Sequence, residues 1–192
     1  MPFFETLEQA ARKPRLWMFL FAATACTLLD EIVVALAVLR LHDDMGWSES
    51  FAAAAMTGYS LGSLSGAIAT ERLIERFAPR RVLVVSTLTC LVALALFVSA
   101  PSSFVALVTL VLLGAAASPH YPLCLAAAYD LVPGKPGLVN ALGQAFVWVD
   151  IVAPLALGAI AARYGVAVAL LTLSLQPLIV LSVVLVSRRS DG

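Results

Sequence analysis

The chain has 192 residues, of which 61% are apolar and 12% charged, and its acidic and basic residues are equal in number. Soluble proteins carry roughly twice this charged fraction, so a chain with a mean hydropathy of +0.98 lacks the charged surface that a soluble domain needs. These values exclude a soluble enzyme, a disordered chain and a nucleic-acid-binding protein with its basic footprint. The apolar runs are continuous rather than alternating, which favours an all-α membrane protein over a β-barrel.

Six stretches of the sequence have the length of about 20 apolar residues that a membrane-spanning helix needs. They cover residues 16–39, 50–70, 82–99, 103–132, 138–162 and 166–186. The predicted organisation is a cytoplasmic interfacial segment (1–15), a six-helix transmembrane bundle (16–186) and a cytoplasmic tail (187–192). In the first segment Phe3, Phe4, Leu7 and Ala11 share one helical face, which is typical of a helix lying in the membrane interface.

The first apolar stretch carries two adjacent acids, Asp30 and Glu31, near its middle. A charge at mid-membrane costs at least ~2.5–3.5 kcal/mol. Adjacent helical positions diverge by about 100°, and Thr24 and Thr27 are near enough to hydrogen-bond one acid or the other. Two interpretations stay open: the pair binds a proton or cation, or a protonated acid ties its helix to a neighbour.

The second stretch has a small residue at every fourth position, namely Ala54, Gly58, Gly62 and Gly66. Small residues on one stripe let helices approach closely. The stripe therefore indicates internal packing, a gating seam or a subunit interface. A loop rich in charge follows it and contains Glu71, Arg72, Glu75, Arg76, Arg80 and Arg81.

The fourth stretch is long for one span and contains Pro119 and Pro122, which predict a kink. His120 lies between these prolines. It is a candidate for the substrate cavity, and the alternative is that it satisfies backbone carbonyl groups that the prolines leave free.

The fifth stretch contributes Asn140, Gln144 and Asp150 as further candidate substrate contacts, with Asp150 turned away from the face that the other two share. No Lys or Arg lies clearly inside any span. The three acids must then be protonated, hydrated, paired with His120, or matched by another subunit or a bound cation. The third and sixth stretches are the most uniformly apolar, which predicts outer, lipid-facing helices.

Basic residues are distributed very unequally between the two sides of the predicted bundle. One side holds Arg40 and Arg163; the other holds ten, namely Arg12, Lys13, Arg15, Arg72, Arg76, Arg80, Arg81, Lys135, Arg188 and Arg189. By the positive-inside rule both termini are cytoplasmic, and the predicted location is the cell (inner) membrane.

A tetrapeptide, Gly-Ala-Ile-Ala, ends the second stretch at residues 66–69 and the fifth at residues 158–161. The two copies fall at equivalent places of two three-helix units whose directions are opposite. This arrangement predicts a 3+3 inverted repeat, an architecture that secondary transporters use.

The charged loop 71–81 resembles the cytoplasmic loop motif of the major facilitator superfamily, with glutamate in place of the usual aspartate and Ala78-Pro79 in place of the usual spacing and glycine. Residues 114–122 are similar to the tenth helix of that superfamily, and residues 132–141 to the entry of its eleventh. The resemblance covers the whole chain and implies half of a major facilitator fold, the carboxy-terminal six-helix half. It further implies that the first and fourth spans line a cavity and that the second and fifth form a moving seam.

The predicted function is that of a half-length secondary transporter of small solutes, embedded in a lipid bilayer and coupled to protons or cations. Asp30 and Glu31 are the predicted coupling residues, and a second copy or another six-helix half completes the cavity. The alternatives are a non-transporting membrane subunit that docks a partner through the glycine stripe, and an inactive truncated half. We expect no enzyme activity, catalytic residues, metal or cofactor, because the sequence has no phosphate-binding glycine loop, metal cluster or hydrolytic serine–histidine pattern.

Overall fold

The computed structural model describes residues 8–189, and these form helices and no strand. The predicted interfacial helix falls partly on residues 1–7 and the predicted tail partly on residues 190–192, which lie outside the described residues. Residues 8–11 are helical, with Arg12 donating to Glu8 over 2.5 Å.

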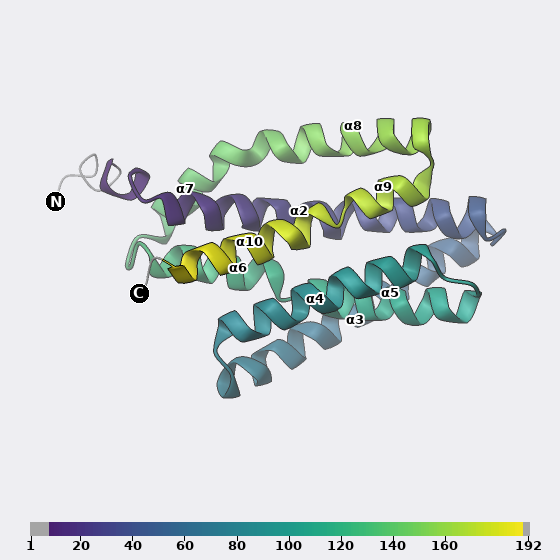
Figure 1. The fold of residues 1–192 in the computed structure, drawn as a ribbon, viewed down its shortest axis with the longest axis horizontal. Coiled ribbons are helices and arrows are strands. Elements are labelled where there is room, and N and C mark those ends of the chain that lie inside the picture. The colour runs from purple at the N-terminus through teal and green to yellow at the C-terminus, as the bar shows by residue number, and fades with distance from the viewer. Residues whose placement is uncertain (1–7, 190–192) are drawn as a thin grey trace.

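Each predicted apolar stretch is helical, with ends within a few residues of those expected except at the end of the second (Figure 1). The first three stretches are α2 (Pro14–Leu39) with the π-helical turn η1 (Arg40–Asp44), α3 (Glu49–Arg76) and α4 (Pro79–Val98). The fourth divides into α5 (Ser103–Ala117) and α6 (His120–Asp130). The last two are α7 (Pro136–Gly143), the 3-10 turn η2 (Gln144–Phe146) and α8 (Val147–Tyr164), then α9 (Val166–Thr172) and α10 (Leu175–Arg189).

Proline interrupts two of these stretches. Pro119 has no amide hydrogen to donate to the preceding turn, and the helix stops at Ala117 and restarts at His120. In the sixth stretch Pro177 likewise removes the hydrogen bond to Leu173, and the chain turns between α9 and α10. The predicted kink at Pro119 is therefore a full break of the helix. A second break, near Pro177, separates α9 from α10.

Five helical stretches of the described chain are long and apolar enough to cross a membrane: Pro14–Asp44, Pro79–Val98, Ser103–Asp130, Pro136–Tyr164 and Val166–Ser187. The helix α3 is not among them, because its small and hydroxylated residues make it less apolar. With 28 residues it is still long enough to span a hydrocarbon core of about 30 Å. The sixth span therefore stays a prediction.

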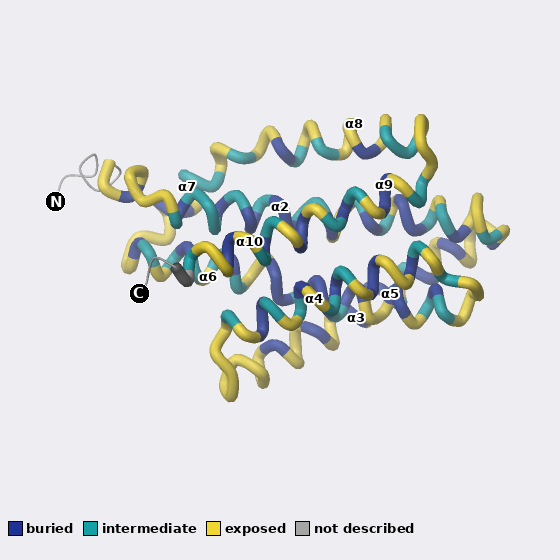
Figure 2. The backbone as a smooth tube through the Cα atoms, viewed as in Figure 1, coloured by how far each residue is buried: buried dark blue, intermediate teal, exposed yellow. Residues whose placement is uncertain are grey.

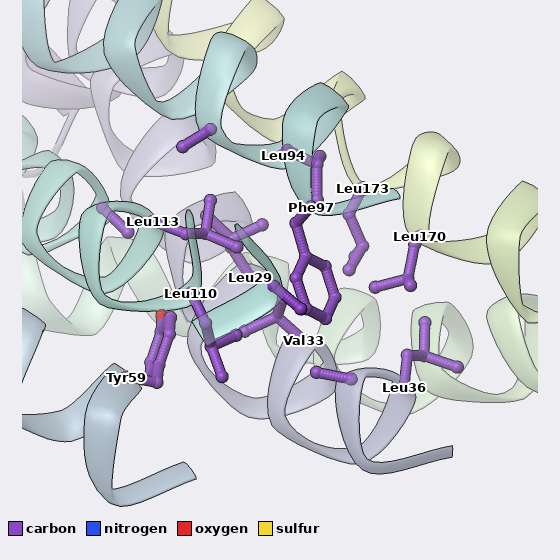
Figure 3. Packing of buried hydrophobic residues seen from close by; sticks show 14 of the residues in the cluster. Leu29, Val33, Leu36, Tyr59, Leu94, Phe97, Leu110, Leu113, Leu170 and Leu173 are labelled. Atoms are coloured by element: carbon purple, nitrogen blue, oxygen red, sulfur yellow. The ribbon is translucent and has the colours of Figure 1, made fainter. Parts of the chain in front are cut away.

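The bundle consists of two interlocked groups. The helices α3, α4 and α5 pack together, while α2 packs against α6, α8 and α10, and contacts of α4 with α9 and α10 join the groups. Their shared core includes Leu29 and Val33 of α2, Tyr59 of α3, Phe97 of α4 and Leu110 of α5, which meet in Figure 3. The predicted three-helix units do not pack separately. The helix α5 belongs to the second predicted unit, but it packs with α3 and α4 of the first.

The glycine stripe of α3 lies against α5. A Cβ atom on Gly62 would overlap the backbone of Val111, and one on Gly66 would overlap the backbone of Ala115. From the other side, Gly114 lies against the carbonyl of Tyr59. The stripe is thus used for internal packing, and the interface that the docking-subunit alternative placed there is already occupied by α5.

The fifth apolar stretch is the least covered. Only 11% of its most apolar part is buried, against 39–50% in the other four stretches that are apolar enough to cross a membrane, and Figure 2 shows α8 along the outside of α2. The helices α4 and α10 contact each other and the core, and each also keeps an exposed apolar side. The exposure of one bundle does not separate a side facing lipid from a side facing a second bundle, so the expectation that the third and sixth stretches face lipid stays a prediction. Apolar sequence does not distinguish a helix facing lipid from one facing protein, because both surroundings are apolar.

The connections alternate between the two ends of the bundle in Figure 1. The described ends of the chain and the α6–α7 connection lie at one end, and the α2–α3, α4–α5 and α8–α9 connections at the other. Gly165, with φ 91°, makes the sharp α8–α9 turn that other residues rarely adopt. The two Gly-Ala-Ile-Ala segments differ in packing, because a Cβ on Gly158 would meet no atom within 4 Å. The inverted repeat stays a prediction.

Candidate functional site

A polar cavity of about 300 Å³ lies beside the middle of α2. Its wall comes from three parts of the chain: α2, α3 and the break between α5 and α6. The lining residues are Thr27, Asp30, Glu31, Ser63, Ser118, Tyr121 and Pro122. Broken helices beside an intramembrane acid are the usual setting of an ion or substrate site in transporters.

Asp30 is held to the wall of this cavity by a hydrogen bond from α3. The hydroxyl of Tyr59 donates to the Asp30 carboxyl over 2.7 Å. Tyr59 itself is only 5% exposed and packs in the core shown in Figure 3. Since the tyrosine ring is fixed by packing, the bond fixes the direction of the carboxyl group.

Glu31 lines the same cavity and has no hydrogen bond or ion pair within the described part of the chain. Both acids are exposed on the surface of the bundle, and the cavity lining contains no Lys or Arg. The two adjacent acids thus occupy one cavity despite the angle between them, but only Asp30 has a fixed partner. The site thus holds two carboxyl groups at mid-helix with no basic residue in its lining.

Thr27 connects the cavity to Asp150 of α8. Its hydroxyl lies 2.7 Å from the Thr24 carbonyl and 2.9 Å from a carboxyl oxygen of Asp150. The expectation that Thr24 or Thr27 bonds Asp30 or Glu31 is therefore wrong. Side chains on a helix lean toward its N-terminus, so Thr27 points to the preceding turn, away from Asp30.

His120 belongs to a buried polar cluster rather than to the cavity. It is 1% exposed, with Nε2 3.4 Å from the Thr87 hydroxyl and Nδ1 3.4 Å from Nε2 of Gln176. Gln176, 3% exposed, also donates to Cys26 over 3.2 Å. The cluster joins α2, α4, α6 and α10 where the two broken stretches meet, so it fixes the breaks relative to each other.

Replacing His120 by alanine is expected to lower stability and to leave the cavity intact. The substitution leaves a buried gap and removes one polar contact each from Gln176 and Thr87, which keep their bonds to Cys26 and Leu83. Losing such buried contacts costs about 1–3 kcal/mol, or a fall of about 5 °C in the unfolding midpoint at 2–4 °C per kcal/mol. Unfolding in detergent followed by circular dichroism measures it. His42→Ala, at the exposed end of α2, is the matched control. A loss of solute binding by folded His120→Ala protein, with no change in midpoint, would contradict this positioning role.

The remaining candidate residues lie outside the cavity. Asn140 accepts a hydrogen bond from Tyr129 over 2.8 Å, and Gln144 is exposed on η2. The predicted charged loop is mostly helical, because α3 continues to Arg76 and α4 begins at Pro79. Arg80, in the first turn of α4, donates to the carbonyl of Val184 over 2.5 Å, which ties α4 to α10. The other charged residues of that motif are exposed: Glu71, Arg72, Glu75, Arg76 and Arg81.

Sequence reasoning missed Tyr59, Ser63, Ser118 and Tyr121. One signal for Tyr59 was present: tyrosine belongs at the ends of a span, where its hydroxyl reaches water. A tyrosine in the middle of a stretch of small residues needs a polar partner, and the nearest acids in sequence are Asp30 and Glu31.

The apolar helices, the two broken stretches and the acidic mid-helix cavity together define a multi-pass membrane protein of the helical-bundle class. The family model of the Major Facilitator Superfamily matches residues 20–191. The chain therefore belongs to this superfamily, whose members are membrane transporters rather than enzymes. A search of curated proteins gave no match to the chain.

Proposed function

We propose that this chain is a six-helix half of a secondary transporter for small solutes, coupled to protons or another cation through Asp30 and Glu31. The observation that carries the proposal is the fixed carboxyl group of Asp30, bonded to Tyr59 at 2.7 Å on the wall of the mid-helix cavity. The cavity volume of about 300 Å³ is at the small end of ligand pockets, which suits a small solute.

The coupling step follows from the charge of the cavity. Two adjacent carboxylates without a basic neighbour repel each other and lose hydration when the cavity closes. Binding of a proton or a cation removes that penalty, so closure favours the loaded form. The fixed Asp30 is the better candidate for loading, and Glu31, without a partner, is free to turn toward solute.

The working unit is proposed to contain a second six-helix bundle, either another copy or another half. Asp30, Glu31 and Tyr121 lie on an exposed face, and carboxylates facing lipid would cost several kcal/mol. Alternating access then rocks the two bundles around the cavity. Cysteine crosslinking in native membranes tests this: Tyr121→Cys should crosslink to a second bundle, and Leu96→Cys, exposed on α4, should not. The reverse pattern would place the interface elsewhere.

Uptake by purified protein in liposomes tests the function itself. A panel of small solutes is supplied with and without an imposed pH or cation gradient. Accumulation that depends on the gradient supports the proposal, and no accumulation by folded protein with any solute argues against it. The docking-subunit alternative is not favoured, because its stripe is filled by α5.

The proposed topology is six spans with both termini in the cytoplasm of the cell. In a background without native cysteines, an impermeant thiol reagent should label Asp44→Cys in intact cells and fail to label Glu75→Cys. Asp44 precedes α3 and Glu75 lies in its last turn, so opposite labelling tests whether α3 crosses the membrane. Labelling of both would show that it does not, and the reverse pattern would overturn the orientation.

A further inference from the structure

A large apolar groove lies between α3, α4 and the end of α5, on a different part of the bundle from the acidic cavity. Its volume is about 690 Å³. The groove exists because α5 stops at Ala117 and the chain then continues as α6, which packs on α2. The ends of α3 and α4 extend past this point without a third helix between them (Figure 1).

The hydroxyl groups along the groove are already used inside their own helices. Ser65 and Thr70 donate to the carbonyls of Gly62 and Gly66 in α3. Ser86 and Thr89 donate to those of Leu83 and Val85 in α4. The remaining lining is carbon from residues such as Leu73 and Phe77. The interior of the groove therefore favours a hydrocarbon occupant over a polar one.

One charged side chain, Arg81, lines the groove, at its mouth. Arg81 is exposed and has no ion-pair or hydrogen-bond partner among residues 8–187. The last turns of α3 add Arg72 and Arg76 against Glu71 and Glu75, and Arg80 is directed to Val184. The mouth of the groove is thus positively charged.

The depth of the groove matches one leaflet of a bilayer. Arg81 lies in the first turn of α4 and Thr89 at the inner limit of the lining, which are eight residues or about 12 Å apart along the helix. Half of the hydrocarbon core is about 15 Å. An apolar groove of this depth, with a positive charge at headgroup level, is complementary to a phospholipid.

We propose that the groove binds an anionic phospholipid, with an acyl chain between α3, α4 and α5 and the headgroup phosphate on Arg81. The occupant completes the packing that a third helix would otherwise supply, and charge complementarity selects an anionic over a zwitterionic lipid. Each basic residue near a membrane surface contributes about 1 kcal/mol of attraction to anionic lipid, so the expected preference is about fivefold.

The test uses the full chain in nanodiscs with a fluorophore on a single cysteine at Val85, exposed in the groove wall. Quenching is measured with phosphatidylglycerol or phosphatidylcholine that carries a nitroxide on the acyl chain. We expect phosphatidylglycerol to quench at about one-fifth of the mole fraction that phosphatidylcholine requires. A label at Leu96, on the same helix outside the groove, should show no preference.

Arg81→Gln should equalise the two lipids at position 85, whereas Arg72→Gln, an exposed arginine outside the lining, should retain the preference. Elution volume and circular dichroism confirm that each variant is folded. Equal quenching in the parent protein, or a preference that survives Arg81→Gln, would overturn the proposal. Absence of quenching by both lipids would do so as well, because it would show that a protein segment covers the groove.

Discussion

Neutralising Asp30 is expected to abolish gradient-driven accumulation of solute while exchange of solute down its own gradient continues. Asp30→Asn keeps the size of the side chain and a hydrogen-bond acceptor for Tyr59, but it cannot take up or release a proton. Accumulation should fall by at least about 100-fold, to the level of empty liposomes, with exchange within a few-fold of the parent. Uptake with and without an imposed gradient, in the same liposomes, measures both quantities.

Two further variants separate coupling from folding. Asp130→Asn, at the exposed end of α6, is a matched control and should keep both activities. Tyr59→Phe removes only the hydroxyl that fixes Asp30, and we expect it to weaken accumulation more than exchange. Glu31→Gln is expected to lower solute affinity instead. If Asp30→Asn and Glu31→Gln both leave gradient-driven uptake unchanged, the acids are structural and the coupling proposal is wrong.

Local chemistry predicts the elements of this fold well. Each helical stretch follows from apolar length, and the break near Pro119 follows from a missing amide hydrogen. The same reasoning applies to Pro177, which lies just after the turn between α9 and α10. The segments that carry the superfamily resemblance lie within the residues that the family model matches.

The sequence does not show which helices contact each other. The partner of Asp30 is 29 residues away on another helix, and the partner of Thr27 is 123 residues away. Helical spacing limits which face a side chain occupies but leaves open which helix lies against that face. His120 illustrates the same limit, because proximity to two prolines was compatible with both a cavity and the buried cluster that the structure forms.

The repeated Gly-Ala-Ile-Ala tetrapeptide provides a test in which the same local sequence meets different surroundings. Gly66 lies against the backbone of Ala115, whereas a Cβ at Gly158 would enter open space. Backbone atoms cannot turn aside as a side chain can, so Gly66→Ala must push α3 away from α5. Overpacking of this kind costs about 1–3 kcal/mol, and we expect the upper part of that range.

Gly158→Ala is expected to raise the stability of the fold, whereas Gly66→Ala lowers it. Alanine replaces glycine within α8 without a clash, which stabilises a helix by about 0.5–1 kcal/mol. The buried thiols of Cys26, Cys90 and Cys124 provide the readout, since a thiol-reactive fluorophore reaches them on unfolding. At 2–4 °C per kcal/mol, Gly66→Ala should lower the midpoint by about 5 °C or more, and Gly158→Ala should raise it slightly. Equal shifts for the two variants would mean that α3 and α5 do not approach as closely as their glycines allow. Gly66→Val, which adds two methyl groups beyond that of alanine at the same contact, should then be tolerated as well.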